Sequence, residues 1–88
     1  MTRDEKRRQK KREELIERVC ENIKAEREAQ ELSLEELGRR MGYNPGTAKS
    51  MAYQIETMYR RMSIGLIGDV AEALEIEPSD LLRKNRGK

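Results

Sequence analysis

The chain changes character at Leu15, from a wholly polar beginning to a segment with apolar residues at helical spacing. Residues 4 to 14, DEKRRQKKREE, are good helix formers and include no apolar side chain that could pack on a core. One helical face of the following segment carries Leu15, Ile16, Val19, Cys20 and Ile23. The pattern predicts a first core helix over residues 13 to 29, preceded by a basic N-terminal arm or helix extension over residues 1 to 14.

The stretch SLEELGRRMGYNPGTAKSM, which begins at Ser33, predicts two helices around a tight turn. Ser33 followed by Glu36 is a capping-box pattern that starts a second helix of about nine residues. Gly42 can take the left-handed conformation that ends a helix. Asn44 is suited to cap a third helix, and Pro45 is suited to its first position.

Apolar spacing extends this third helix well beyond the turn. At about 100° per residue from Pro45, one set of side chains falls within an arc of about 80°, and a polar set falls on the opposite side. The first set is Ala48, Met51, Ile55, Met58 and Met62, and the second is Lys49, Tyr53, Thr57 and Arg60. One continuous helix over residues 45 to 62, about 27 Å long, explains both sets.

Two shorter helices complete the pattern. Ser63 can cap a fourth helix. Its inward face comprises Leu66, Ile67, Val70, Ala71 and Leu74. A turn at Pro78 starts a short fifth helix that carries Leu81 and Leu82. The five helices predict an all-α domain over residues 15 to 82.

The composition supports packed helices, and the charge is unevenly distributed. Only 35% of residues are apolar and 3% are aromatic, whereas 41% are charged, so the core must be small and aliphatic. Residues 1 to 14 carry seven Lys/Arg against four Asp/Glu, residues 63 to 80 carry none against five, and the basic C-terminal tail, residues 83 to 88, carries four. This segregation implies a partner that binds in one orientation, although each charged run could also be a solvated face.

The residues that support catalysis or metal binding are missing from the sequence. With no His and one Cys, neither a disulfide within the chain nor a zinc site is expected. No Gly-rich phosphate loop is present, and no apolar run reaches the roughly 18 residues that cross a membrane. We therefore expect no enzyme, no metal, no cofactor and no membrane association, and a reduced, cytoplasmic setting.

Three groups of residues carry a resemblance to a known family. Val19, Ile23 and Arg27 have the matching spacing in the first helix, the turn region reads SLEELGRRMGY, and the chain closes with VAEALEIEPSDLL. Through these residues, positions 19 to 82 resemble the Cro/repressor type (lambda repressor-like) of helix-turn-helix DNA-binding domain, which has five helices. The resemblance implies that the second and third helices cross closely at Gly38, where the family has a small residue.

The resemblance also indicates where DNA would be contacted. The family places its third, recognition helix in the major groove, and its base-reading positions correspond here to Pro45, Gly46, Lys49 and Ser50. Pro45 and Gly46 have no side-chain donor for hydrogen bonds to bases. Recognition of base edges is therefore expected from Lys49, Ser50 and Tyr53. The full set of DNA contacts expected around this helix start is Asn44, Pro45, Gly46, Thr47, Lys49, Ser50 and Tyr53. The alternative is that Lys49 and Tyr53 are ordinary exposed side chains.

The chain departs from the family pattern in three places. The family usually has a phosphate-binding Gln where this chain has Leu34, and usually a Glu where it has Ala52. The connection to the fourth helix is about four residues longer, roughly one helical turn, which implies an extended recognition helix. Arg60 and Arg61 would then either contact phosphates or cap the negative end of that helix.

The basic arm is a second candidate for binding double-stranded DNA. Its Arg7, Arg8, Lys10 and Lys11 could neutralise phosphates or enter a groove, as the lambda repressor arm does by resemblance. A solubilising tail with no partner is the alternative.

A single helix-turn-helix reads too few base pairs to be selective, so a homodimer on two half-sites about 34 Å apart is expected. Leu82 is the better dimer candidate, while Leu81 and Leu15 are expected to close the core of the monomer.

Two functional hypotheses follow. The first is a sequence-specific DNA-binding transcriptional regulator, a nucleoid-associated repressor of the phage or mobile-element kind that binds an operator as a homodimer. The second is an antitoxin-like or scaffold module that keeps the fold and holds a protein partner. The departures at Leu34 and Ala52 and the Pro-Gly helix start are what favour the second.

Overall fold

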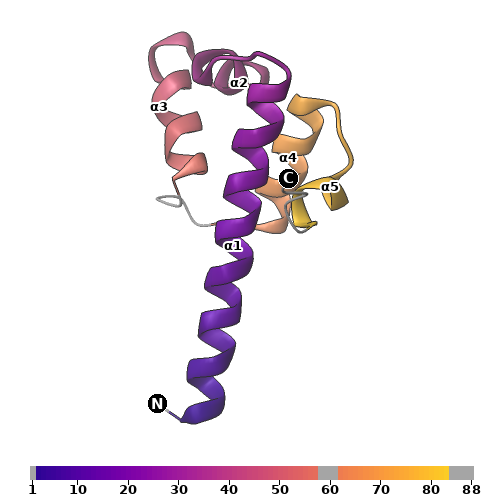
Figure 1. Cartoon of the computed structure of the whole chain (residues 1–88). Coiled ribbons are helices and arrows are strands. Elements are labelled where there is room, and N and C mark those ends of the chain that lie inside the picture. Colours follow the sequence, from indigo (N-terminus) through magenta and orange to yellow (C-terminus); the bar gives the residue numbers. More distant parts are fainter. Residues whose placement is uncertain (1, 58–61, 84–88) are drawn as a thin grey trace.

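The computed structural model describes residues 2–57 and 62–83, and these form five helices (Figure 1). The helices are α1 (Arg3–Ala29), α2 (Leu34–Arg40), α3 (Pro45–Glu56), α4 (Ile64–Leu74) and α5 (Pro78–Leu82). No strand occurs within the described residues. The predicted all-α fold of five helices is confirmed.

The first helix, α1, runs without a break from the polar beginning of the chain into the core. It starts with a capping box, in which Thr2 Oγ1 accepts the Glu5 N–H at 3.1 Å and Glu5 Oε1 accepts the Thr2 N–H at 2.7 Å. Residues 3–14 are exposed, and Figure 1 shows this part of α1 extending beyond the other four helices. The polar beginning is therefore a helix extension, and we call residues 3–14 the projecting half of α1.

The core forms where the second half of α1 meets the four other helices. Its largest fully buried side chains are Val19, Ile23, Leu37, Ile55, Val70, Leu74 and Leu81. Every helix contributes at least one of them. Because burying an aliphatic side chain of this size stabilises the fold by about 1.5–3 kcal/mol, none of the five helices is dispensable.

The two leucines expected to close the core differ in outcome. Leu81 is fully buried, as predicted. The expectation for Leu15 is wrong, because its side chain is 41% exposed, as is that of Leu82. Leu15 directly follows the exposed residues 3–14 of α1 in the sequence, so it lies at the edge of the part of α1 that packs on the core.

Two side-chain amides, one on α1 and one at its C-cap, hold the later helices against α1. Asn22 Nδ2 donates to the carbonyl oxygens of Leu81 at 2.9 Å and Arg83 at 2.7 Å. Gln30 Nε2 donates to the Leu74 carbonyl oxygen at 2.7 Å. Carbonyls at the ends of helices have no partner within the helix, so these amides satisfy them and hold α4 and α5 against α1.

The helix starts follow the capping residues that the sequence predicts. The Ser33 and Ser63 hydroxyls each accept the backbone N–H three residues later, at 3.0 Å. The second helix has seven residues and ends at Arg40, so it is slightly shorter than predicted. Gly42 has φ of 100°, which is the left-handed conformation that its type allows.

The third helix is shorter than the predicted helix over residues 45 to 62. It ends at Glu56, and Thr57 leaves the helical conformation with φ of −107° and ψ of 12°. Thr57 Oγ1 donates to the Tyr53 carbonyl oxygen at 2.7 Å, and its N–H donates to the same oxygen. This double use of one carbonyl is typical of a bent or terminating helix. Residue 62 lies outside α3, and Met58, Arg60 and Arg61 lie outside the described residues.

Candidate nucleic-acid interface

Gly38 allows α2 and α3 to cross in direct backbone contact. A Cβ atom at this position would overlap the carbonyl oxygen of Ala48 and would lie 2.6 Å from its carbonyl carbon. Backbone atoms cannot move aside as a flexible side chain can, so any larger residue would force the helices apart. The close crossing implied by the family resemblance is confirmed.

The start of α3 is set by backbone hydrogen bonds in the turn. Asn44 occupies the N-cap position and Pro45 the first helical position, as predicted, but the Asn44 side chain makes no capping hydrogen bond. The Asn44 carbonyl oxygen instead accepts the N–H groups of Thr47 at 2.9 Å and Ala48 at 2.8 Å. The Thr47 N–H, which a capping side chain would bind, is thus already bonded to the Asn44 backbone. The Asn44 side-chain amide remains exposed at the start of the helix.

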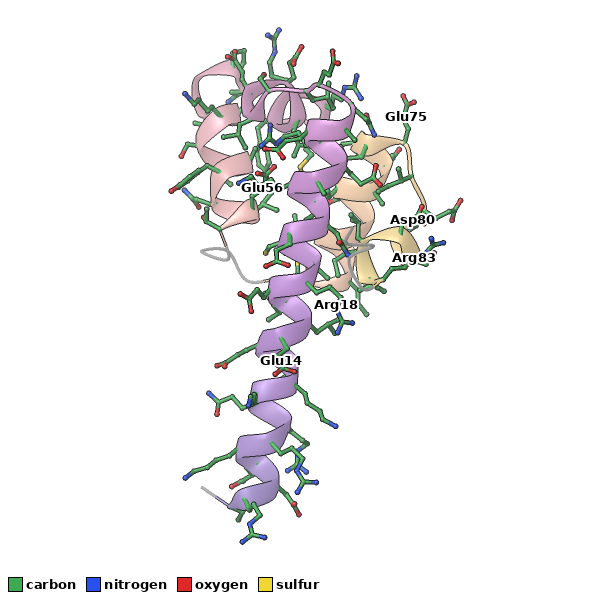
Figure 2. The ribbon with its side chains drawn as sticks, viewed as in Figure 1. Glu14, Arg18, Glu56, Glu75, Asp80 and Arg83 are labelled. Carbon is green, nitrogen blue, oxygen red and sulfur yellow. The ribbon has the colours of Figure 1, made fainter. Side chains whose placement is uncertain are left out.

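The other end of α3 is fixed to α1 by a largely buried ion pair. Arg27 Nε donates to Glu56 Oε2 at 2.6 Å, and Arg27 Nη2 donates to Glu56 Oε1 at 3.2 Å. The two side chains are 12% and 6% exposed. Figure 2 shows Glu56 lying between α3 and α1. Arg27 Nη1 also donates to the Leu32 carbonyl oxygen at 2.8 Å, so a single guanidinium joins α1, α3 and the segment before α2.

This ion pair further stabilises the charged form of Arg27. The hydrogen bond with Glu56 raises the pKa of Arg27, which outweighs the lowering effect of burial. A second contact lies beside it, because Cys20 Sγ donates to the Ile55 carbonyl oxygen at 3.1 Å. Together the two contacts join the C-terminal end of α3 to α1.

The ion pair was not foreseen, although a signal for it exists in the sequence. The family usually has a Glu where this chain has Ala52, so the sequence pattern predicts that this polar group is absent. Glu56 is one helical turn later and therefore points in nearly the same direction. A missing polar residue should thus be sought one turn away before it is considered lost.

The buried face of α3 is rotated from the predicted one. Ala48 and Ile55 are fully buried, as predicted, but Ala52 is also fully buried and Met51 is only half-buried. Close contact with α2 favours the small alanines at the helix crossing. With Glu56 also facing inward, the buried stripe follows the two alanines and not the methionines.

The predicted DNA contacts on α3 lie on the surface of the protein. The residues Asn44, Pro45, Gly46, Thr47, Lys49 and Ser50 are exposed, and Tyr53 is 52% exposed. A Cβ atom at Gly46 would meet nothing within 4 Å. Asn44 is the N-cap of α3 and the other six residues belong to the helix, so this set surrounds the start of α3 and continues along its exposed side to Tyr53.

The basic residues on α1 do not join that face. Arg7, Arg8, Lys10 and Lys11 are exposed along the projecting half of α1. In Figure 1 this half extends away from the end of the molecule where α2 and the start of α3 lie. Their contact with DNA stays a prediction, as does that of Arg61, which lies outside the described residues.

The start of α2 carries negative charge in place of a phosphate ligand. Leu34 is half-buried against the core. The Glu36 carboxylate accepts the Ser33 N–H at 2.8 Å, and hydrogen bonds from the Ser33 backbone and hydroxyl lower the pKa of Glu36. This helix end is therefore occupied by the protein's own anion, which makes a phosphate contact there unfavourable.

Acidic side chains gather on the side of the molecule away from α3. Asp69, Glu72 and Glu75 line a hollow of about 620 Å³ together with Arg40, whose Nη1 donates to the Ala73 carbonyl oxygen at 3.2 Å. In Figure 1, α3 lies on one side of α1 and α4 on the other. These carboxylates make the surface around α4 unfavourable for a polyanion.

No helix within residues 2–57 and 62–83 is long and apolar enough to span a membrane. Over the same residues, no group of three or more His, Cys, Asp or Glu side chains is placed to hold a metal ion.

Comparison with known proteins agrees with the geometry of α2 and α3. A helix-turn-helix family model matches residues 23–81, which include the turn, the recognition helix and most of the core. No curated protein and no solved structure matches the chain. The chain belongs to the helix-turn-helix family of the lambda repressor/Cro type, a family of DNA-binding transcription regulators.

Proposed function

We propose that this protein is a sequence-specific repressor of the phage or mobile-element type, which occupies an operator as a homodimer with α3 in the major groove. The observation that carries the proposal is the fixed outer face of α3. Its helix start is held by Gly38, its end is held by Arg27, and between them Lys49 and Tyr53 are exposed. A rigidly held helix loses little freedom when it binds, which favours selective reading.

The dimensions of α3 suit the groove. Its 12 residues make a cylinder about 18 Å long, and the major groove is about 12 Å wide. Pro45 and Gly46 leave the helix tip narrow, so the backbone can approach the base edges closely. Lys49, one turn further along, can then donate to guanine, with Ser50 and Tyr53 beside it.

The proposal is tested by titrating the full chain into labelled DNA from upstream of its own gene, at about 50 and 200 mM salt. Lys49→Ala should weaken binding to the operator by about tenfold, since one good base contact contributes about 1–3 kcal/mol of discrimination. Lys24→Ala is the matched control, because Lys24 is an exposed lysine on α1 and should leave binding unchanged.

Three outcomes are distinguishable. Selective loss at the operator supports Lys49 as a reader. An equal loss on all sequences makes Lys49 a phosphate contact. No binding at low salt would end the repressor proposal and would favour the protein-interaction alternative, whose supporting observation is the acidic hollow at Asp69, Glu72 and Glu75.

A further inference from the structure

Three exposed apolar side chains from three helices line one groove. Leu15 of α1 and Leu82 of α5 are each 41% exposed, and Ile64 at the start of α4 is 88% exposed. Together with Val19 and Ile67 they line a hollow of about 220 Å³, which we call the α1–α4–α5 groove. Among the described residues, Tyr53 on α3 is the one other large apolar side chain with such exposure.

The shape of the groove argues against a small molecule. Its volume of about 220 Å³ is below the roughly 300–1,000 Å³ of typical ligand pockets. Ile64 projects from its rim and is almost entirely exposed, whereas a ligand pocket would enclose such a side chain. A partner that covers the groove must have a hollow that accepts Ile64 and an apolar side chain that enters the groove. A second copy of this chain has both, because its own groove accepts Ile64 and its own Ile64 can enter the groove.

The projecting half of α1 continues the same surface. Counted at about 100° per residue, Arg8 and Arg12 point in nearly the same direction as Val19. They line a neighbouring hollow with Glu5 and Gln9. Arg12 borders both hollows, so the groove and this face of the projecting half form one continuous strip.

The projecting half lacks support from its own chain. In Figure 2 the part of α1 before Glu14 carries outward side chains with no other helix beside it. A 12-residue helix of polar residues is marginal in water without a packing partner. Its length of about 18 Å is close to the roughly 16 Å of the 11-residue α4.

The charges on the two surfaces are opposite. Between residues 63 and 82 the chain has no Lys or Arg, and Asp69, Glu72 and Glu77 are exposed there. Asp80 is already paired with Arg83 at 3.1 Å (Figure 2). A two-fold axis through the groove would carry the projecting half of one copy alongside α4 and α5 of the other.

We propose that two copies of the chain pack groove to groove about a two-fold axis. Ile64 of each copy enters the α1–α4–α5 groove of the other, and Arg8 and Arg12 lie along the other copy's acidic α4 and α5. The same patch serves on both copies, as in other two-fold dimers. The groove alone is smaller than the roughly 800 Å² per partner of a stable interface, and the projecting half supplies the remaining area. This inference rests on the proposed function in one respect: a repressor that binds an operator of two half-sites needs a dimer, and this interface would form that dimer.

Sedimentation equilibrium of the full chain tests the apolar half of the interface. The wild type should dimerise in the micromolar range, and Ile64→Lys should raise the dimer Kd by at least tenfold. Ala25→Lys adds the same charge at an exposed position on α1 and should leave the Kd unchanged. Ile64 is so exposed that Ile64→Lys should keep the wild-type circular dichroism spectrum. A monomeric wild type, or equal dimerisation of both variants, overturns the proposal.

The charged half has its own matched pair of variants. Arg8→Gln with Arg12→Gln should weaken the dimer severalfold at low salt and less at high salt, because salt screens exposed charges. Arg7→Gln with Lys10→Gln removes the same charge from the opposite face of α1 and should leave the dimer unchanged. Equal effects of both pairs would overturn the contact of Arg8 and Arg12 with the second copy.

DNA titrations separate this inference from the proposed function. With Ile64→Lys, binding to a single half-site should match the wild type, while binding to a two-half-site operator should fall by tenfold or more. A wild type that dimerises through Ile64 but binds no DNA would uphold the dimer and overturn the repressor. A wild type that binds DNA but remains a monomer on it would overturn the dimer, and with it the homodimer part of the proposed function, but would uphold DNA binding by α3.

Discussion

The Arg27 guanidinium holds the Glu56 carboxylate through two hydrogen bonds, so the end of the recognition helix is anchored to the first helix 29 positions away in the sequence. Both side chains are nearly buried, so replacing only one of them should lower the free energy of unfolding substantially. Each charge left alone in the interior would lose its hydration without compensation.

Glu56→Gln should therefore destabilise the domain by about 3 kcal/mol, because Arg27 would remain buried without a counter-charge. Urea unfolding followed by circular dichroism measures this change. Glu35→Gln is the control, since Glu35 pairs with Arg39 at 3.8 Å on the surface and should cost about 0–1 kcal/mol. The double variant Arg27→Met/Glu56→Leu should recover most of the lost stability. If Glu56→Gln costs no more than Glu35→Gln, the pair is not what anchors α3.

Gly38→Ala should prevent α2 and α3 from meeting, because the added carbon would collide with the Ala48 backbone. The expected result is a loss of several kcal/mol or failure to fold, as for other overpacked sites, measured by thermal unfolding. Gly46→Ala is the matched control, because Gly46 is helical and its Cβ would meet nothing within 4 Å. It should raise stability by about 0.5–1 kcal/mol. Equal tolerance of both alanines would contradict the close crossing.

Glu75 offers a way to stabilise the fold. It ends α4 in the left-handed conformation with φ of 59°, which Gly adopts at much lower cost than other residues. Glu75→Gly should raise the free energy of unfolding by up to about 1 kcal/mol. Glu72→Gly, one turn earlier inside the helix, should lower it by a similar amount. Chemical denaturation of the two variants in parallel compares them, and a destabilised Glu75→Gly would show that this carboxylate has a role beyond its backbone.

Acid stability should depend on Glu36. Hydrogen bonds from Ser33 lower its pKa below 4.5 in the folded state, so the unfolded state binds the proton more readily. The stabilisation is therefore present above pH 4.5 and is lost as the pH falls through the lower, folded-state pKa. Glu36→Gln should flatten the stability profile in the range where the pH falls below 4.5. Ser33→Ala removes the hydroxyl but keeps the backbone N–H, which is the larger cause of the pKa shift, so it should flatten the profile less than Glu36→Gln. It should also cost about 1 kcal/mol at neutral pH as a lost helix cap. An unchanged profile in both variants would contradict the capping box.

Local chemistry explains what could be predicted from the sequence. The helix starts at Ser33, Pro45 and Ser63 follow from residues within one turn, and so does the left-handed Gly42. The family resemblance added the crossing at Gly38. Each of these features depends on a few neighbouring residues or on a short motif.

Features that depend on distant partners were missed. The end of α3 depends on Thr57 and on the anchoring of Glu56 by Arg27, so the helical wheel alone made the helix too long. The wheel also favoured Met51 over Ala52 for the core, because it counts apolarity and ignores the space between two crossing helices. The exposure of Leu15 depends on where α4 and α5 end in space, which no local pattern records.

The hydrogen bonds from Asn22 to the carbonyls of Leu81 and Arg83 have a consequence for biosynthesis. The chain is made from its N-terminus, so α1 leaves the ribosome long before the residues that its amide must meet. Until α5 has been translated, the Asn22 amide can hydrogen-bond only to water. Once α5 is present, the amide can be buried and can donate to the two carbonyls. A chain that stops before α5 would lack both carbonyl partners of the buried Asn22 amide, so we expect the complete core to form only after α5 has been translated.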